Sequence, residues 1–145
     1  TVMGFIASGK QAGRLVCGGE RIARNGSDAY VQPTIFTDLR PDARVVREEI
    51  FGPVLTIQTF KTEDEALAMA NDSPYALAAS VWTRDLGRAL SVSDRLNAGT
   101  VSVNTVDALS AMTPFGGMKQ SGFGRDLSIH SFDKYSALKT TWIKY

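Results

Sequence analysis

Residues 54–104 alternate between strand-like and helix-like segments, and this alternation constrains the fold more than any other feature. The segments "VLTIQTF", "ALAASVWT" and "TVSVN" are rich in β-branched and apolar residues, which is typical of strands. Two helical segments, "TEDEALAMAN" and "RDLGRALSVSDRLNAG", lie between them. Strand–helix–strand–helix–strand is the pattern of a right-handed parallel unit. We therefore predict an α/β fold with a parallel βαβαβ sheet, whose "ALAASVWT" strand is buried on both faces.

The two helical segments carry their own boundary signals. Thr62, with Glu65 three residues later, forms a capping box at the start of the first helix. In the second helix, Leu86, Leu90 and Leu96 fall broadly on one face, and Gly99 is placed as a C-terminal stop. Ligands of parallel sheets gather at the carboxyl ends of the strands, which is where Asn104 stands.

The first fifty residues predict a helix followed by extended segments. Val2, Phe5 and Ile6 have helical spacing, with Gly9 and Gly13 as breakers. "RLVCGGERI" reads as a short strand that ends in a Gly-Gly turn. "AYVQPTIFTDL" is a second extended run, in which the proline favours an edge or irregular strand.

The composition is that of one ordinary globular domain. The chain has 145 residues, of which 43% are hydrophobic and 21% charged. A net charge of +1 implies no strong attraction to nucleic acid or to a membrane. The longest apolar stretch, "YALAASVW", is too short to span a bilayer. A single cysteine, Cys17, excludes an internal disulfide and fits a reducing compartment, so we expect a cytoplasmic protein.

Three motifs follow one another along the chain: "EEIFGPV" at residues 48–54, "VN" at 103–104 and "PFGGMKQSGFGRD" at 114–126. In this order and spacing they resemble the NAD(P)-dependent aldehyde dehydrogenases, and the resemblance extends over essentially the whole chain. Within that family the chain is most similar to the enzymes that oxidise γ-glutamyl-aminobutyraldehyde and other amino-aldehydes. The resemblance implies a C-terminal, catalytic-domain fragment of an enzyme that oxidises an aldehyde to a carboxylic acid through a cysteine thiohemiacetal and thioester.

The resemblance assigns Glu49 and Phe51 to the coenzyme, NAD or NADP. It implies that Glu49 accepts hydrogen bonds from the nicotinamide ribose hydroxyls and that Phe51 packs beside the nicotinamide. A carboxylate accepts two hydroxyl donors at once, and an apolar ring restricts where the nicotinamide lies. The alternative is that Glu48 and Glu49 form a solvated acidic turn and that Phe51 belongs to the core.

The segment "NTVDALSAMTPF", residues 104–115, carries the substrate assignments that the resemblance implies. Asn104 anchors the floor of the active site, while Asp107, Leu109 and Phe115 line the aldehyde tunnel. An apolar wall with one acid suits an aldehyde that carries a distal amine, because a carboxylate attracts an ammonium group. The alternative for Asp107 is an exposed loop residue that caps a turn.

Several other features are read as structural rather than functional. "GGMKQSGFGR" lacks the Gly-Lys-Ser/Thr ending of a phosphate-binding loop, so its glycines are explained by backbone geometry. His130 is the only histidine and has no second ligand nearby, which predicts neither a metal site nor a catalytic triad. Cys17 follows a short apolar strand and is predicted to be a small buried hydrophobe rather than a nucleophile.

The resemblance divides the chain at residue 136. Residues 1–136 would be a partial catalytic domain, and residues 137–145 an oligomerisation strand that pairs with a neighbouring subunit. The family's catalytic cysteine and glutamate fall upstream of this chain, so no catalytic residue is assigned within it and the chain alone is predicted to be inactive. A homodimer or homotetramer is expected for the parent enzyme, with an aldehyde as its small-molecule partner.

Two alternatives to this function stay open at the level of sequence. One is a non-catalytic assembly or binding module, and the other is an acylating enzyme that transfers the acyl group to coenzyme A. A Gly-Gln-x-Cys-like stretch immediately upstream of Thr1 would identify the parent as an enzyme.

Overall fold

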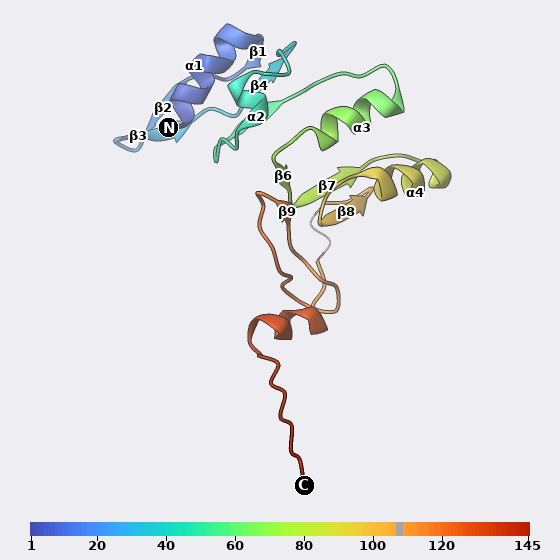
Figure 1. Cartoon of the computed structure of the whole chain (residues 1–145). Coiled ribbons are helices and arrows are strands. Elements are labelled where there is room, and N and C mark those ends of the chain that lie inside the picture. The colour runs from blue at the N-terminus through green and yellow to red at the C-terminus, as the bar shows by residue number, and fades with distance from the viewer. Residues whose placement is uncertain (107–108) are drawn as a thin grey trace. The chain divides into compact units, whose positions relative to one another are not determined.

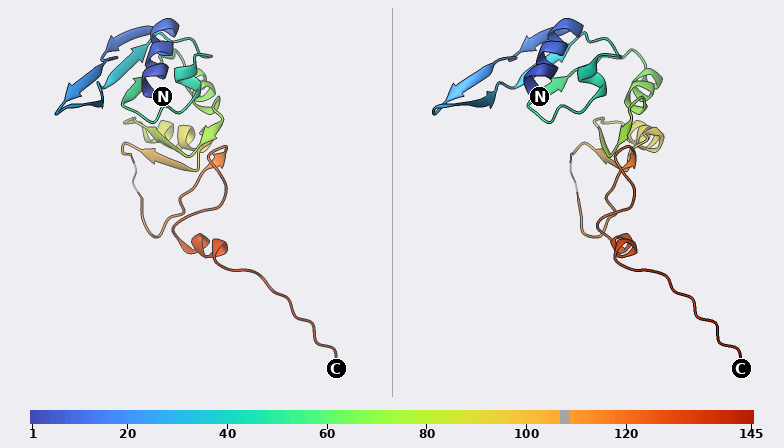
Figure 2. Two further views of the ribbon diagram at one scale, coloured as in Figure 1. Left: turned by 90° about the vertical axis from the view of Figure 1, so that its left-hand side faces the viewer. Right: turned by 60° about the vertical axis from the view of Figure 1, so that its left-hand side comes forward.

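The computed structural model describes residues 1–106 and 109–145, and they form two compact units, Thr1–Lys61 and Thr62–Tyr145. Figures 1 and 2 show helices and strands in both units, so the predicted α/β class is confirmed. Among the described residues, none of the helices combines the length and the apolar composition that a membrane crossing requires.

Unit 1 (Thr1–Lys61) has a three-stranded sheet in the order β1-β4-β5, with a separate β2–β3 hairpin. β1 and β4 are antiparallel, whereas β4 and β5 are parallel. Its elements are α1 (Val2–Ala12), β1 (Arg14–Cys17), β2 (Arg21–Arg24), β3 (Ser27–Val31), β4 (Thr34–Thr37), α2 (Arg44–Arg47) and β5 (Val54–Thr56).

The core of unit 1 lies between α1 and β4. Phe36 of β4 is 0% exposed, and Phe5 and Ile6 of α1 belong to the same buried cluster. Gly9 does not break the helix as predicted. It lies within α1, where an added Cβ would come 2.8 Å from the Phe36 ring, so the missing side chain leaves room for that ring. Gly13 does end the helix.

Among the described residues of unit 2 (Thr62–Tyr145), β7 and β8 form a parallel pair that is connected through α4. A second, antiparallel pair joins β6 to β9. The described elements are α3 (Glu63–Asn71), β6 (Tyr75–Ala76), β7 (Ala78–Val81), α4 (Leu86–Arg95), β8 (Thr100–Val103), β9 (Met118–Lys119) and the 3₁₀ helix η1 (Ile129–Lys134).

The predicted βαβαβ sheet is therefore only partly observed. The predicted "TVSVN" strand is present as β8, and β7-α4-β8 is a parallel βαβ unit. The predicted strand at residues 54–60 is shortened to β5, and its observed partner is β4 of unit 1. β7 alternates between exposed and half-buried positions instead of being buried on both faces.

The helix boundaries follow local signals better than the helix faces do. Thr62 caps α3, since its Oγ1 accepts a hydrogen bond from the Glu65 amide at 3.2 Å. The predicted apolar face of α4 is wrong, because Leu86 and Leu90 are 72% and 65% exposed while Ala89 is buried. Gly99 lies beyond the end of α4, and a Cβ there would overlap the carbonyl oxygen of Gly116.

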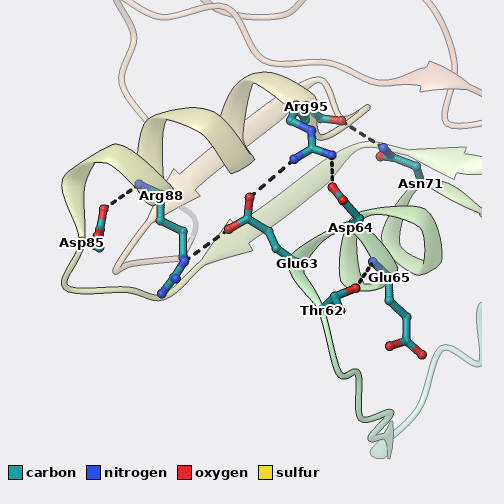
Figure 3. Close-up of polar contacts among 8 residues, drawn as sticks. All are labelled: Thr62, Glu63, Asp64, Glu65, Asn71, Asp85, Arg88 and Arg95. Carbon is teal, nitrogen blue, oxygen red and sulfur yellow. Dashed lines mark hydrogen bonds and ion pairs between the residues drawn. The ribbon is translucent and has the colours of Figure 1, made fainter.

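Charged side chains connect α3 to α4 along the surface of unit 2 (Figure 3). Glu63 accepts hydrogen bonds from Arg88 at 3.2 Å and from Arg95 at 3.4 Å, and Asp64 also accepts from Arg95. This hydrogen bond from the guanidinium to Asp64 raises the pKa of Arg95 above its ordinary value. The Asn71 side chain bonds the backbone at the end of α4, donating to the Arg95 carbonyl at 2.9 Å.

Residues 137–145, which we call the C-terminal tail, follow η1 as an extended segment without strand pairing among the described residues (Figure 2). Their side chains are exposed, including Leu138, Trp142 and Ile143. The oligomerisation strand predicted for these residues stays a prediction.

Candidate functional site

The 48–53 loop (residues 48–53) joins α2 to β5, and alternate residues of this loop are held by the rest of unit 1. The Glu48 carboxylate accepts hydrogen bonds from Arg44 Nε at 3.1 Å to each of its two oxygens. Ile50 packs against the buried cluster. Gly52 lies against Val2 of α1, where an added Cβ would come 2.8 Å from a Val2 methyl group.

The residues between these contacts, Glu49 and Phe51, are both exposed. Glu49 makes no hydrogen bond or ion pair with any residue that the structure describes. Phe51 is 86% exposed and has a φ of 49°, a left-handed conformation that is unusual for an aromatic residue. The alternative that Phe51 belongs to the core is therefore wrong. The free carboxylate and the exposed ring are instead available to a ligand.

Glu49 and Phe51 border an open recess of about 440 Å³, which we call the unit 1 recess. It is lined by the loop and by flanking residues of α2 and β5, namely Val45, Val46, Glu48, Glu49, Ile50, Phe51, Gly52, Val54, Leu55 and Thr56. The lining combines an acidic edge with aliphatic side chains. Such a surface suits a ligand that presents hydroxyl groups beside a flat apolar ring.

A second recess, of about 180 Å³, lies on the β7–β8 pair and brings together two of the predicted substrate residues, Leu109 and Phe115. We call it the unit 2 recess. The other lining residues are small or aliphatic, namely Ala78, Ala79, Ser80, Thr100, Ser102 and Val106. A short, mainly apolar recess of this kind suits a small organic group rather than a polymer.

Asn104 follows β8 and does not line the unit 2 recess. Its side chain forms two hydrogen bonds of 2.9 Å with the backbone of Thr83, accepting from the amide and donating to the carbonyl. Its φ of 54° is left-handed, a conformation that asparagine tolerates better than most residues. Asn104 therefore ties the end of β8 to the end of β7. Asp107, the remaining predicted substrate residue, lies outside the described residues.

The glycine-rich segment that follows Phe115 is fixed by side chains that the sequence did not single out. Lys119 Nζ donates to the carbonyls of Asn71 and Ser73 at 2.9 and 3.0 Å, at the end of α3. Ser121 Oγ accepts from the Ala76 amide at 2.9 Å. Phe115 itself pairs with Asp126 across the segment. These contacts hold the segment that carries Phe115.

Two residues that the sequence marked as non-functional are also exposed. Cys17, at the end of β1, is an exposed thiol rather than the small buried hydrophobe predicted from its neighbours. The reason is that β1 is exposed along most of its length, with Leu15 as its one half-buried residue. His130 is exposed at the start of η1. Within residues 1–106 and 109–145, no three metal-ligating side chains gather.

Arg44 is the site residue that sequence reasoning missed. A signal was present, because an arginine four residues before a glutamate places the two side chains on one helix face. The signal lies in the helical turn that precedes the "EEIFGPV" motif.

Comparison with known proteins identifies the class to which these features belong. The family model "Aldehyde dehydrogenase family" matches residues 1–141, and the chain is therefore a member of the aldehyde dehydrogenase family. Among curated relatives, the NADP/NAD-dependent aldehyde dehydrogenase PuuC of Escherichia coli (strain K12) is 50% identical over 143 residues. That match covers 99% of this chain and 28% of the relative.

Solved structures give the same result. An indole-3-acetaldehyde dehydrogenase, AldA of P. syringae in complex with NAD+ and IAA, matches with a TM-score of 0.92 and 50% identity, covering 99% of this chain and 29% of that protein. The γ-glutamyl-γ-aminobutyraldehyde dehydrogenase of Burkholderia cenocepacia matches with a TM-score of 0.90 and 52% identity, covering 97% and 28%. The chain thus spans somewhat over a quarter of the length of these relatives.

Proposed function

We propose that this chain is the part of an NAD(P)-dependent aldehyde dehydrogenase that supplies one side of the coenzyme pocket and part of the aldehyde-binding wall. The observation that carries the proposal is the 48–53 loop. It presents a carboxylate without a partner and an exposed aromatic ring in a left-handed conformation, between residues that are firmly held. Strained, exposed residues on a well-anchored loop are a frequent feature of ligand sites.

The side chains of the unit 1 recess fit the nicotinamide half of NAD or NADP. Glu49 would accept hydrogen bonds from both hydroxyl groups of the ribose, and Phe51 would restrict the position of the nicotinamide ring. When bound, the coenzyme supplies the hydride acceptor. The contribution of this chain would be to orient that acceptor, since a small misplacement of reacting groups slows transfer strongly.

The unit 2 recess would form part of the aldehyde-binding wall. Leu109 and Phe115 would contact the apolar part of the substrate, while Asn104 would keep the ends of β7 and β8 together beneath it. Asp107 would attract a distal ammonium group, which makes an amino-aldehyde the preferred substrate. The similarity to the γ-glutamyl-γ-aminobutyraldehyde dehydrogenase of Burkholderia cenocepacia supports this substrate class.

The remaining parts of the proposal concern the whole enzyme. Residues 1–136 would belong to the catalytic domain, and the C-terminal tail would pair as a strand with a neighbouring subunit of a homo-oligomer. The nucleophilic cysteine and the glutamate that activates water would come from sequence outside this chain, so the chain alone would be inactive. The single cysteine favours a cytoplasmic location.

The first experiment tests whether this chain is inactive by itself. The purified 145-residue protein and its Cys17→Ala variant are incubated with NAD+ or NADP+ and an amino-aldehyde, and the reduced coenzyme is measured by absorbance. We expect no turnover in either protein. Turnover that disappears in the Cys17→Ala variant would show that the chain carries its own nucleophile.

The second experiment tests the coenzyme site in a hybrid enzyme, in which this whole chain replaces the matching 28% of the E. coli relative. Glu49→Gln is compared with Asp94→Asn, a change at an exposed carboxylate of α4. Loss of charge-assisted hydrogen bonds should raise the coenzyme Kd by about tenfold in Glu49→Gln only. Unchanged coenzyme affinity and turnover would contradict the proposed site.

The same hybrid distinguishes the alternative functions by its products. A hydrolytic enzyme forms the carboxylic acid without coenzyme A, whereas an acylating enzyme requires coenzyme A and forms a thioester. A hybrid that folds and oligomerises but oxidises no aldehyde would favour the non-catalytic assembly module. A preference for amino-aldehydes over aliphatic aldehydes, lost in Asp107→Asn, is the expected result for the substrate class.

A further inference from the structure

We propose that Arg44 is a positioning residue, which sets the place of Glu49 and Phe51 by clamping the start of the 48–53 loop to helix α1. The inference rests on the proposed coenzyme function of that loop. It assigns a role to a residue outside the "EEIFGPV" motif that touches neither the ribose nor the nicotinamide.

Arg44 contacts the loop and the core at the same time. Its Nε donates to both oxygens of Glu48 at 3.1 Å, and its main-chain carbonyl accepts from the Glu48 amide at 3.0 Å. The flat face of the guanidinium lies over Phe5, with Cζ 4.0 Å from the ring centroid. Phe5 is buried in the core of unit 1. The guanidinium is therefore stacked on a fixed ring while it holds the first residue of the loop.

The far end of the loop is fixed to the same helix. Gly52 lies against Val2, three residues before Phe5 in α1, and Ile50 packs on the buried cluster. Glu49 and Phe51 thus lie between two contacts with α1, the first through Arg44 and the second through Gly52. If the contact through Arg44 is lost, the carboxylate of Glu49 gains freedom to move. Every group that would touch the coenzyme is still present.

The arrangement depends on a guanidinium and not merely on a positive charge. Nε and the planar fork reach a carboxylate while the flat face stacks on an aromatic ring, whereas a lysine ammonium makes a point contact and does not stack in this way. Lysine at position 44 should therefore restore only part of the effect that glutamine removes.

The expected consequence is a change in coenzyme binding rather than in the chemical step. A less ordered loop must be ordered when the coenzyme binds, and this cost weakens affinity. At saturating coenzyme the loop is in place again. In the hybrid enzyme we expect Arg44→Gln to raise the coenzyme Kd and KM by about five- to twentyfold, with kcat changed by less than about twofold.

The test compares Arg44→Gln, Arg44→Lys and Glu48→Gln with Arg40→Gln as the matched control. Arg40 is an exposed arginine whose Nε lies 3.3 Å from Asp42, so its loss removes the same charge without touching the loop. The coenzyme Kd should be highest for Arg44→Gln and lower for Arg44→Lys. For Arg40→Gln it should equal that of the parent. The double variant Arg44→Gln/Glu48→Gln should bind coenzyme with the same Kd as Arg44→Gln, because both changes remove the same contact between the two side chains.

A second measurement uses the 145-residue chain itself and needs no coenzyme. Amide hydrogen exchange at Glu48, whose N–H donates to the Arg44 carbonyl at 3.0 Å, should accelerate by about tenfold or more in Arg44→Gln relative to Arg40→Gln, while exchange at Phe36 in the core stays the same. Faster exchange at Phe36 as well would mean that Arg44 only stabilises the unit, and the positioning role would be wrong.

The outcomes also separate this inference from the proposed function. If Glu49→Gln weakens coenzyme binding and Arg44→Gln behaves like Arg40→Gln, the coenzyme site stands and the clamp is refuted. If Glu49→Gln has no effect, the coenzyme site fails, and the positioning role fails with it.

Discussion

Asn104 offers the sharpest test of how a motif residue acts in this fold. Its side-chain amide both accepts from and donates to the Thr83 backbone, with both distances at 2.9 Å. Asn104→Ala removes both hydrogen bonds and leaves alanine at a φ of 54°. Asn104→Asp keeps the acceptor for the Thr83 amide but places a second acceptor against the Thr83 carbonyl. The two variants therefore remove different parts of one contact.

The magnitudes follow from the hydrogen bonds and the backbone conformation. Two net hydrogen bonds at an exposed position are worth about 1–2 kcal/mol together, and a left-handed alanine costs about 1 kcal/mol more. We expect Asn104→Ala to lower the free energy of unfolding of unit 2 by about 2–3 kcal/mol. Asn104→Asp should cost about 1 kcal/mol, since aspartate tolerates this conformation and keeps one of the two bonds.

Urea unfolding provides the assay, because Trp82 stands directly before Thr83 and reports on this end of β7. All proteins carry Trp142→Phe, so that Trp82 is the only tryptophan that emits. Thr105→Ala is the control for a nearby change, since its side-chain hydrogen bond is long, at 3.4 Å. Equal losses for Asn104→Ala and Asn104→Asp, or a loss below about 0.5 kcal/mol for Asn104→Ala, would refute the two-bond account.

Two further predictions concern local backbone geometry. Gly52→Ala should weaken the packing of the 48–53 loop, because the new Cβ would come 2.8 Å from Val2, and Val2→Ala should relieve the clash in the double variant. Both effects are measured as the rate of hydrogen exchange at Val54, whose amide donates to the Gly52 carbonyl at 2.7 Å. Thr62→Ala should lower the stability of unit 2 by about 1 kcal/mol through loss of the α3 cap, whereas Thr62→Ser should cost less, as measured by urea unfolding.

The parts of the fold that sequence predicted are those decided by neighbouring residues. The Thr62 cap depends on residues three apart in the chain, and it is present as predicted. The pairing of β5 with β4 depends instead on residues twenty apart, as in the Thr34–Val54 pair. A run of β-branched residues predicts a strand but does not choose its partner, so the pairing of β5 with β4 could not be predicted.

The prediction of the buried face of α4 is wrong for a related reason. Leu86 and Leu90 are large apolar residues of the helix, yet Ala89 is the buried one. A hydrophobic pattern records which side chains prefer burial, whereas the packing of α4 on β7 and β8 decides which face is turned inward. Close approach also favours a small residue such as Ala89 over leucine.

For the candidate site, the motif indicates the 48–53 loop but not the residue that holds it in place. Glu49 and Phe51 were selected by resemblance, and both are exposed as ligand contacts must be. The clamp by Arg44 requires knowledge that Phe5 lies beneath the guanidinium, which is a contact across 39 positions of the chain. Sequence spacing predicts the ion pair to Glu48 but not the ring that fixes it.

Phe51 shows how a binding loop and a stable loop differ. An aromatic residue at a φ of 49° costs about 1–2 kcal/mol, and at 86% exposure the ring recovers little of this by burial. Glycine adopts this conformation freely but is more flexible when unfolded, whereas alanine keeps the strain. Phe51→Gly should therefore be more stable than Phe51→Ala by about 1 kcal/mol, the reverse of their usual order outside left-handed positions.

If Phe51 is retained for coenzyme contact, both variants should bind coenzyme more weakly in the hybrid enzyme and to a similar extent, since both lack the ring. Hydrogen exchange at Phe36 measures the stability of unit 1, and a coenzyme titration measures the affinity. An alanine variant that is more stable than the glycine variant would show that the backbone at Phe51 is unstrained. Coenzyme affinity that survives in both would show that the strain serves some purpose other than nicotinamide binding. A Phe51→Gly variant that is more stable than Phe51→Ala, and yet binds coenzyme as weakly, is what a strained loop that serves its ligand rather than its fold should display.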